Sequence, residues 1–567
     1  MALAAGAIVF VGGFAAITRL GVVPQFMHDD YEYTYPSFNL ARMGEFGSPL
    51  MGTGLNVEHR TYNFTMYYYA TVHAALIRMY GDRPESMALA NMFHCSLLLA
   101  CAIAYCIYRG QIVMGLVFVI AFLSDRLVIA AALAGRPEMT AAFGYFIALL
   151  SLYEWQVWHR RSPWLLAAAS GGAVVAGLTH PAGVIVLLPT FVLFVALNVR
   201  HLLNLPNAAA LLAPFSVPVL LYAYFAATDD WRNIAAQMLA NSGGNIIWAR
   251  RRAMLEAGQF RGLVATAKPV WDHFSNVRFV YAVPGIVAGV AAVAAGDRLA
   301  SWREELRTHV SGAVFFSVAF VLAVIMHWLF LKEFVGSYTV IYRCAWYLAL
   351  GISISMLVLP IQAWLAARHW TELNAGALAL AVALYITSHD AAAVAARLHG
   401  GFKFADYVRF RTELNEAMTA AGAHAGDQIY CPSPFGTYLS PEFRPVTYGG
   451  ERYFADMWPP SFDIALDGKR AAAREPSSLG YLKKIVFLDP RWIVTWDEDY
   501  SDLQDYMRFV KSFTNVDPDI RIVEAGNYVS QHTYVGGVHI FRVDLNPAFS
   551  NALDRRLDVE RGLARYR

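Results

Sequence analysis

The sequence predicts a polytopic α-helical membrane protein with about eleven transmembrane helices and a C-terminal extracytoplasmic α/β domain. Three observations support this fold class. Hydrophobic residues make up 57% of the 567 residues, charged residues only 16%, and the mean hydropathy is +0.39. The apolar residues come in blocks of about twenty, the length that crosses a bilayer. From about residue 392 these blocks stop and strand-like segments begin.

The N-terminal block, residues 2–20, is the first predicted span. It has no charged start and no clear small-residue cleavage site, so we expect a retained helix rather than a signal peptide. Hydropathy places the further spans near residues 86–107, 111–124, 137–157, 163–179, 181–199, 207–227, 278–296, 310–331, 343–366 and 374–390. Pro137, Pro181, Pro214 and Pro218 lie within or beside these blocks, as membrane helices tolerate.

Basic residues gather in alternate connections, which predicts the orientation. With a cytoplasmic N-terminus, the inside connections carry Arg109, His159 to Arg161, Arg200, the arginines between 298 and 307, and Arg368. This is the positive-inside pattern. The outside then receives the connections at 21–85, 125–136, 228–277 and 332–342, together with the C-terminal tail.

The tail has the composition of a separate domain. Segments such as DQIYC, KKIVFLD, RWIVTW, IRIVEAG and GVHIFRVDL read as strands, and FADYVRFRTELNEAMTAAG and SDLQDYMRFVKSF read as helices. We therefore expect a transmembrane domain over residues 1–391 and a soluble α/β domain over residues 392–567.

Charge and cysteine usage exclude several classes of function. The net charge is +2, and no basic stripe with interleaved aromatic residues is present, so nucleic acid is not expected as a partner. The five cysteines form neither a disulfide framework nor a CxxC metal site, and four of them lie in hydrophobic blocks.

The candidate functional residues lie at predicted outer helix ends. Asp29 and Asp30 directly follow the first span, where carboxylates are costly to keep near hydrocarbon and need a functional reason. Other acids and cations at similar predicted depth are Asp125, Glu138, His59, Arg60, Arg126, Arg136, His180, Arg250 to Arg252 and Arg343. This combination of carboxylates and cations suits either catalysis or ion handling at the membrane surface.

The order of these motifs resembles the GT-C class of membrane glycosyltransferases. An acidic pair closes the first helix about fifteen residues before Gly44, and an aromatic helix, YNFTMYYYATVHAALIRMYG, leads to the second span. AGRPEMTAAFGYF then opens a later helix with an arginine and an acid, and GLTHPAGVIVLLP is also similar to the class. The nearest likenesses are the protein O-mannosyltransferase, aminoarabinose transferase and arabinofuranosyltransferase branches. Glu138 stands where many members have Asp.

The resemblance implies a fold, a reaction and a set of roles. It implies a bacterial inner-membrane, multi-pass enzyme that moves a sugar from a polyprenyl-phosphate donor to a periplasmic glycan, lipid or protein acceptor. Asp29 would be the general base, Asp30 and Glu138 would orient the acceptor or bind a divalent ion, and no organic cofactor is expected. The donor phosphate would be held by His59, Arg60, Arg126 and Arg136, with further contacts from His180, Arg251 and Arg343.

Each assignment has a structural alternative. Asp29 and Asp30 can cap the following helix, and Glu138 can favour the helix dipole in a first turn. His59 and Arg60 can lie on a solvated loop, Arg250 to Arg252 can face lipid headgroups, and His180 can satisfy backbone freed by Pro181. For the whole chain the alternative is a transporter or flippase of a lipid-linked saccharide. Such proteins place ionisable residues near mid-span and show paired repeats.

Overall fold

The computed structural model describes most of the transmembrane region and parts of the tail. The described residues are 1–19, 22–23, 30–44, 46, 66–82, 84–228, short pieces between 253 and 268, 303–330, 336–366, 402–430, 439–440, 442–446, 492–496, 520–526 and 538–543.

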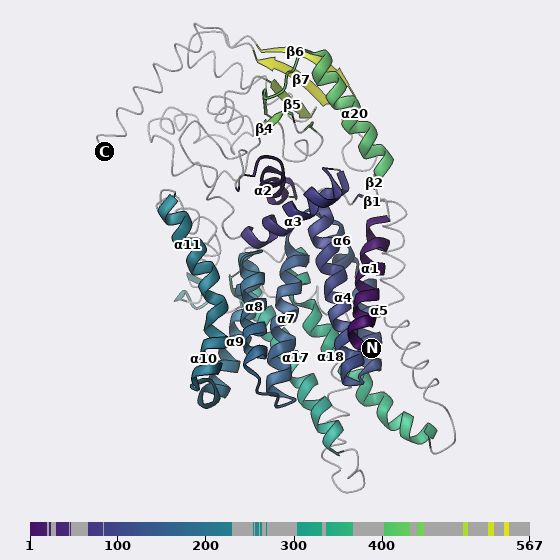
Figure 1. The fold of residues 1–567 in the computed structure, drawn as a ribbon, viewed down its shortest axis with the longest axis vertical. Coiled ribbons are helices and arrows are strands. Elements are labelled where there is room, and N and C mark those ends of the chain that lie inside the picture. Colours follow the sequence, from purple (N-terminus) through teal and green to yellow (C-terminus); the bar gives the residue numbers. More distant parts are fainter. Residues whose placement is uncertain are drawn as a thin grey trace, which may run out of the picture.

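Helices dominate the first 366 residues (Figure 1). In chain order the α-helices are α1 (Ala2–Arg19), α2 (Asp30–Met43), α3 (Tyr67–Tyr80), α4 (Leu89–Arg109), α5 (Ile112–Ser124), α6 (Arg126–Leu133), α7 (Glu138–Gln156), α8 (Pro163–Gly177), α9 (Pro181–Leu202), α10 (Leu205–Leu212), α11 (Ser216–Thr228), α17 (Arg303–Phe330) and α18 (Gly336–Ala366). Two short 3-10 helices, η3 (Pro84–Ala88) and η4 (Ala213–Phe215), join neighbouring helices.

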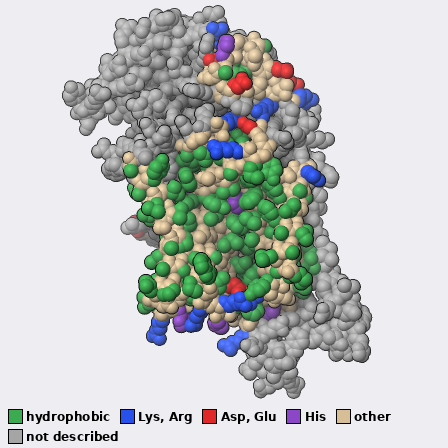
Figure 2. Space-filling model, in the orientation of Figure 1, with side chains coloured by type: hydrophobic (Ala, Val, Ile, Leu, Met, Phe, Trp, Pro, Cys, Tyr) green, Lys and Arg blue, Asp and Glu red, His purple; other side chains and the backbone are tan. Residues whose placement is uncertain are grey.

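Six described helices are long and apolar enough to cross a membrane, or seven if the bent pair α5 and α6 is one span. This confirms a multi-pass helical protein but not the eleven predicted spans. The blocks at 137–157 and 163–179 form α7 and α8, but α8 is only 15 residues long and α7 does not meet the same criterion. The predicted spans at 278–296 and 374–390 lie outside the described residues. Figure 2 shows the hydrophobic belt around the bundle, with charged side chains at its two ends.

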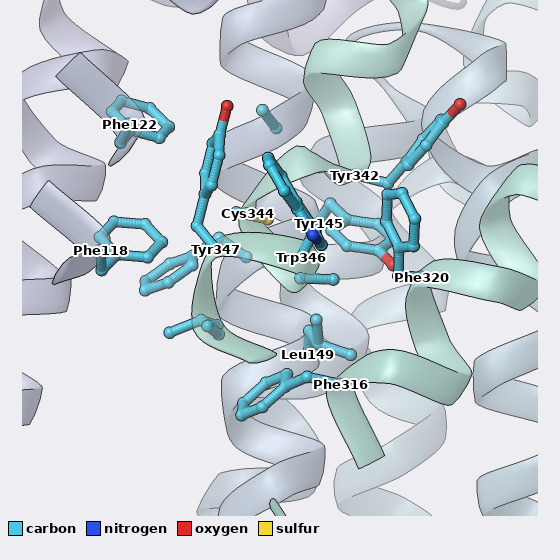
Figure 3. Close-up of a cluster of buried hydrophobic side chains, with 14 of the residues drawn as sticks. Phe118, Phe122, Tyr145, Leu149, Phe316, Phe320, Tyr342, Cys344, Trp346 and Tyr347 are labelled. Carbon is cyan, nitrogen blue, oxygen red and sulfur yellow. The ribbon is translucent and has the colours of Figure 1, made fainter. Parts of the chain in front are cut away.

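The core of the bundle lies where α5, α7, α17 and α18 meet. Figure 3 shows aromatic side chains from all four helices interleaved there, among them Phe118, Tyr145, Phe316 and Tyr347, all of which are buried. Phe118 meets Phe146 and Tyr347 in tilted and edge-on pairs, with ring centroids 5.8 and 6.3 Å apart. Such interlocking fixes how α18 sits against α5 and α7.

Small residues let α7 and α8 approach closely. A Cβ on Gly144 would lie 2.6 Å from the backbone nitrogen of Ala176, and one on Gly172 would lie 2.6 Å from the carbonyl oxygen of Gly144. Glycine is therefore required at both positions, as at other close crossings of membrane helices. A Cβ on Gly171, the adjacent residue, would meet nothing within 4 Å.

The bend between α5 and α6 is fastened by a buried ion pair. The two helices meet at 69°, and Asp125 at the break accepts the backbone N–H of Leu127 at 2.7 Å, which caps α6. Its second oxygen accepts hydrogen bonds from Arg343 and from the hydroxyl of Tyr347, both on α18. The Arg343 side chain is only 2% exposed, and Thr339 accepts from its Nε at 2.9 Å.

The described part of the tail forms a helix and a mixed sheet at one end of the bundle (Figure 1). Helix α20 (Phe404–Ala420) precedes strands β3 (Gln428–Tyr430), β4 (Arg444–Val446), β5 (Trp492–Trp496), β6 (Ile520–Gly526) and β7 (Val538–Val543), in the sheet order β4-β3-β5-β7-β6. The β4-β3 and β3-β5 pairs are parallel, and the β5-β7 and β7-β6 pairs are antiparallel. The predicted segments DQIYC, RWIVTW, IRIVEAG and GVHIFRVDL thus contain strands. KKIVFLD lies outside the described residues, and a separate domain over residues 392–567 stays a prediction.

The tail packs on the helices that follow α1. Strand β1 (Val22–Val23), just after α1, pairs antiparallel with β2 (Phe402–Lys403), just before α20. Side chains of α2, α3 and η3 (Phe38, Ile77 and Met87) share one core with Leu414, Met418, Ile429, Trp492 and Ile540. The sheet therefore lies over α2 and α3, at the end of the bundle where α7 begins (Figure 1).

Candidate functional site

Arg136 and Glu138 form a buried ion pair at the start of α7. Pro137 stands between them, and α7 begins at Glu138, where an acid also favours the helix dipole. The Nε of Arg136 donates to Oε1 of Glu138 at 2.8 Å, with the two side chains 7% and 0% exposed. Among the described residues, Oε2 of Glu138 has no hydrogen-bond partner. Since buried polar atoms are normally paired, this carboxylate oxygen is a position at which a further hydrogen-bond donor can bind.

Two tyrosines from distant helices flank the guanidinium of Arg136. Its Cζ lies 5.4 Å from the ring centroid of Tyr33 on α2 and 5.6 Å from that of Tyr338 on α18. Both distances are within the range of cation–π attraction. The pair thus sits where α2, α7 and α18 meet, and the two rings limit where the arginine can move.

His180 joins the same group from the start of α9. Its ring centroid lies 5.1 Å from that of Tyr338 and 6.1 Å from that of Tyr33. Its Nδ1 accepts the backbone N–H of Ala182 at 3.1 Å, which caps α9 and leaves Nε2 as the hydrogen donor of the neutral ring. Burial lowers the pKa of His180 to about 4, while the charge of Glu138 raises it and that of Arg136 lowers it. His180 is therefore neutral at pH 7.

The loop that carries Arg136 is held by hydrogen bonds at three successive carbonyls. The amide of Asn91 on α4 donates to Ala134, at 2.7 Å, and to the carbonyl of Arg136. The hydroxyl of Tyr69 on α3 donates to the carbonyl of Gly135 at 2.6 Å. Each carbonyl of residues 134–136 is thereby fixed to a neighbouring helix, and the arginine is presented from a rigid support.

The same asparagine also fixes the first turn of α7. Its Oδ1 accepts from the hydroxyl and the backbone N–H of Thr140 at 3.0 and 3.3 Å. The ring of His94 continues this network: its Nδ1 lies 2.6 Å from the carbonyl of Ala90, and its Nε2 lies 3.2 Å from the hydroxyl of Tyr68. A ring protonated on Nδ1 satisfies both contacts, donating to the carbonyl and accepting from the tyrosine.

Some of the predicted site residues lie close together in the structure, and others do not. Arg136, Glu138 and His180 come together. Arg126 is exposed at the first position of α6, and Arg343 is paired with Asp125 at the helix bend. Asp29, His59, Arg60 and Arg251 lie outside the described residues, and Asp30 is described only as the first residue of α2. The roles assigned to these residues stay predictions.

Sequence reasoning missed Tyr33, Tyr338 and Asn91. Tyr33 lies in the segment DDYEYTY, close enough to the acidic pair to be suspected. Tyr338 and Asn91 carry no local signal, because their roles depend on which helices pack together. The hydroxyls of Tyr68 and Tyr69, in the aromatic helix α3, reach His94 and the loop before α7. In the part of the chain that the structure describes, no group of three or more His, Cys, Asp or Glu residues could hold a metal ion.

The chain matches no protein-family model and no curated protein in sequence. Its structure is similar to the crystal structure of ArnT from Cupriavidus metallidurans bound to undecaprenyl phosphate, with a TM-score of 0.53 and 11% identity over 95% of this chain and 99% of that chain. The crystal structure of the same protein in the apo state gives a TM-score of 0.44 and 13% identity, covering 96% of this chain and 98% of that one. The GT-C-like fold expected from the order of the motifs is confirmed: along nearly its whole length, the chain has the fold of ArnT.

Proposed function

We propose that the chain is an inverting GT-C glycosyltransferase that moves a sugar from a polyprenyl-phosphate donor to a cell-envelope glycan, lipid or protein. The observation that carries the proposal is the buried Arg136–Glu138 pair, with an open carboxylate oxygen, between Tyr33, Tyr338 and His180. This group lies at one end of a fold shared with a protein whose crystal structure holds undecaprenyl phosphate. The phosphate group of such a ligand is negatively charged, which suits a site with a fixed buried cation.

Arg136 is proposed to hold the donor phosphate. A guanidinium presents its N–H donors in a planar fork that matches a phosphate, and it keeps its charge when buried. The fixed carbonyls of its loop mean that the cation need not reorganise as charge develops on the departing phosphate. The Nε2–H of neutral His180 supplies a second donor that brings no further positive charge.

Asp29 is proposed as the general base, with Asp30 beside it. Asp30 is the first residue of α2, and Tyr33 stands one helical turn later on the same face, in contact with the Arg136 group. We therefore propose that the acidic pair acts close to the arginine. In the proposed step the acceptor oxygen forms a bond to the anomeric carbon while the bond from that carbon to the phosphate oxygen breaks. The acceptor proton passes to the Asp29 carboxylate, and polyprenyl phosphate leaves with the bonding electron pair.

Glu138 is proposed to orient the acceptor. Its Oε1 is held by Arg136, so Oε2 can accept a hydrogen bond from a second acceptor hydroxyl. The tail sheet packs on α2 and α3 at the same end of the bundle, which places it where it can help to present the acceptor. In this proposal the protein lies in the bacterial inner membrane with a cytoplasmic N-terminus, and the Arg136 group and the tail face the periplasm.

The test combines cells with purified protein. A deletion strain should lack one sugar on an envelope glycan, lipid or protein, and mass spectrometry of that material names the donor sugar and the acceptor. With both known, Asp29→Asn should leave a folded protein whose rate is about 10²–10⁴ times lower. Asn caps a helix as well as Asp does, so a merely capping residue would keep near-normal turnover.

Asp30→Asn is measured beside it. If Asp29→Asn keeps more than about a tenth of the rate and Asp30→Asn does not, the base is Asp30. If both variants and Glu138→Gln stay active, or if the deletion strain has normal envelope glycans, the proposed function is wrong.

A further inference from the structure

A groove opens at the opposite end of the bundle from Arg136. It has a volume of about 660 Å³ and lies between the end of α7, the second half of α9 and the first half of α17. Helix α7 runs between the two sites: Glu138 begins it, and Gln156, its last residue, lines the groove. Eighteen residues at 1.5 Å each separate them by about 27 Å, close to the thickness of the hydrocarbon core. The groove therefore faces the other leaflet.

The inner part of the groove is apolar and open to the side. Leu193 and Leu197 on α9 and Val314 and Val318 on α17 line it, and they are 40%, 67%, 43% and 39% exposed. Both helices are candidate membrane spans, so these side chains face lipid rather than water. An apolar groove that faces lipid accepts a hydrocarbon chain.

The mouth of the groove is basic. Arg307 and His159 line it, and none of the described lining residues is acidic. The neighbouring exposed cations at this end are Arg160, Arg161 and Arg200, and Nη1 of Arg161 lies 3.0 Å from Nδ1 of His201. Figure 2 shows basic and histidine side chains gathered at this end of the bundle. Glu304 and Glu305 near the start of α17 are outnumbered by these arginines together with Arg303 and Arg307. The charge favours an anionic headgroup.

We propose that this groove binds an anionic glycerophospholipid from the leaflet at the basic end. One acyl chain lies between α9 and α17, and the headgroup phosphate contacts Arg307 and His159. The lipid would fill the groove between two helices whose far ends lie near His180 and Tyr338. The proposal does not depend on the reaction catalysed at the other end.

Native mass spectrometry of the purified full-length protein tests this, with phosphatidylglycerol and phosphatidylcholine of identical acyl chains as probes. The wild type should retain phosphatidylglycerol in preference to phosphatidylcholine. Arg307→Gln should weaken that retention about fivefold, the effect of one basic residue near a membrane surface. Arg200→Gln removes a charge at the same end but outside the groove, and it should weaken retention clearly less than Arg307→Gln does. Ser311→Trp, at an exposed lining position, should fill the groove and release both lipids.

Three results would overturn the proposal. Equal retention of the two lipids by the wild type would remove the role of the basic mouth. Equal losses in Arg307→Gln and Arg200→Gln would show diffuse attraction to the whole basic end. Displacement of phosphatidylglycerol by an equal concentration of undecaprenyl phosphate would assign the groove to a polyprenyl chain instead.

Discussion

Two similar ion pairs at the two ends of α7 allow the role of Arg136 to be separated from its structural contribution. At the start, Arg136 pairs with Glu138 between Tyr33 and Tyr338. At the end, Arg109 pairs with Glu154, with the arginine Cζ 5.4 Å from the ring of Tyr108 and 4.1 Å from that of Trp158. Side-chain exposures are 7% and 0% in the first pair and 9% and 8% in the second. The pairs thus match in chemistry, burial and aromatic flanks.

Neutralising each pair as a unit is the informative perturbation. Removing one partner of a buried pair costs about 3–5 kcal/mol, because an unpaired charge is left behind. The double changes Arg136→Gln with Glu138→Gln, and Arg109→Gln with Glu154→Gln, avoid that penalty. Gln has the shape of Glu and is shorter than Arg, and this loss of volume is the same at both ends. Both proteins should fold with similar thermal stability. Only the first should lose activity, since a charge-assisted phosphate contact contributes about 2–4 kcal/mol to transition-state binding, or roughly thirty- to a thousandfold.

The assay is initial rate against donor concentration for purified protein in detergent, beside a thermal unfolding scan. The Arg136 pair should show a raised donor KM and a lowered kcat at unchanged unfolding temperature. The Arg109 pair should keep wild-type kinetics. An activity change under threefold at Arg136, or an equal loss at both ends, would refute the assignment of Arg136 to the phosphate.

Three further outcomes are expected. The pKa of His180 falls from the ordinary value of about 6.5 to about 4 on folding, so the unfolded chain takes up the proton first. The contribution of neutral His180 to the free energy of unfolding is complete above pH 6.5 and is lost as the pH falls toward 4. The variant His180→Asn keeps a capping acceptor but does not titrate in this range. Its unfolding temperature should therefore fall less between pH 6.5 and pH 4 than that of the wild type. Gly172→Val should destabilise the protein by more than about 3 kcal/mol, because its Cβ meets backbone, whereas Gly171→Ala should leave stability equal or slightly higher. In intact cells a membrane-impermeant thiol reagent should label a cysteine at Ser433 but not one at Ser162, and equal labelling would reverse the predicted orientation.

The sequence predicted best what depends on local pattern. Apolar block length located nine of the predicted spans, which correspond to α1, α4, α5, α7, α8, α9, α10 with α11, α17 and α18, but it did not locate α2, α3 or α6. The arginine and acid around Pro137 marked the start of α7. Period-two segments located β5, β6 and β7. Packing decided the rest: Arg136 is held at the site by an asparagine 45 residues away and flanked by tyrosines on α2 and α18, and no local pattern encodes those distances along the chain.

Arg343 is a second residue whose role is decided by packing rather than by the local sequence. Its sequence position, at a predicted outer helix end, suited a phosphate contact. In the structure Arg343 pairs instead with Asp125, which lies 218 residues earlier in the chain and at the bend between α5 and α6. Hydropathy ended the span at residue 124 and predicted an outer connection over residues 125–136, whereas the structure has the helix α6 over Arg126–Leu133.

The Asp125–Arg343 contact also constrains the order in which the protein is made. Asp125 is synthesised 218 residues before its arginine, an interval of about 10–40 s at ordinary translation rates. During that time a carboxylate stands in the middle of an apolar segment with its cation still on the ribosome, and an unpaired charge in hydrocarbon is costly. We therefore expect the bend between α5 and α6 to become stable only when α18 supplies Arg343 and Tyr347.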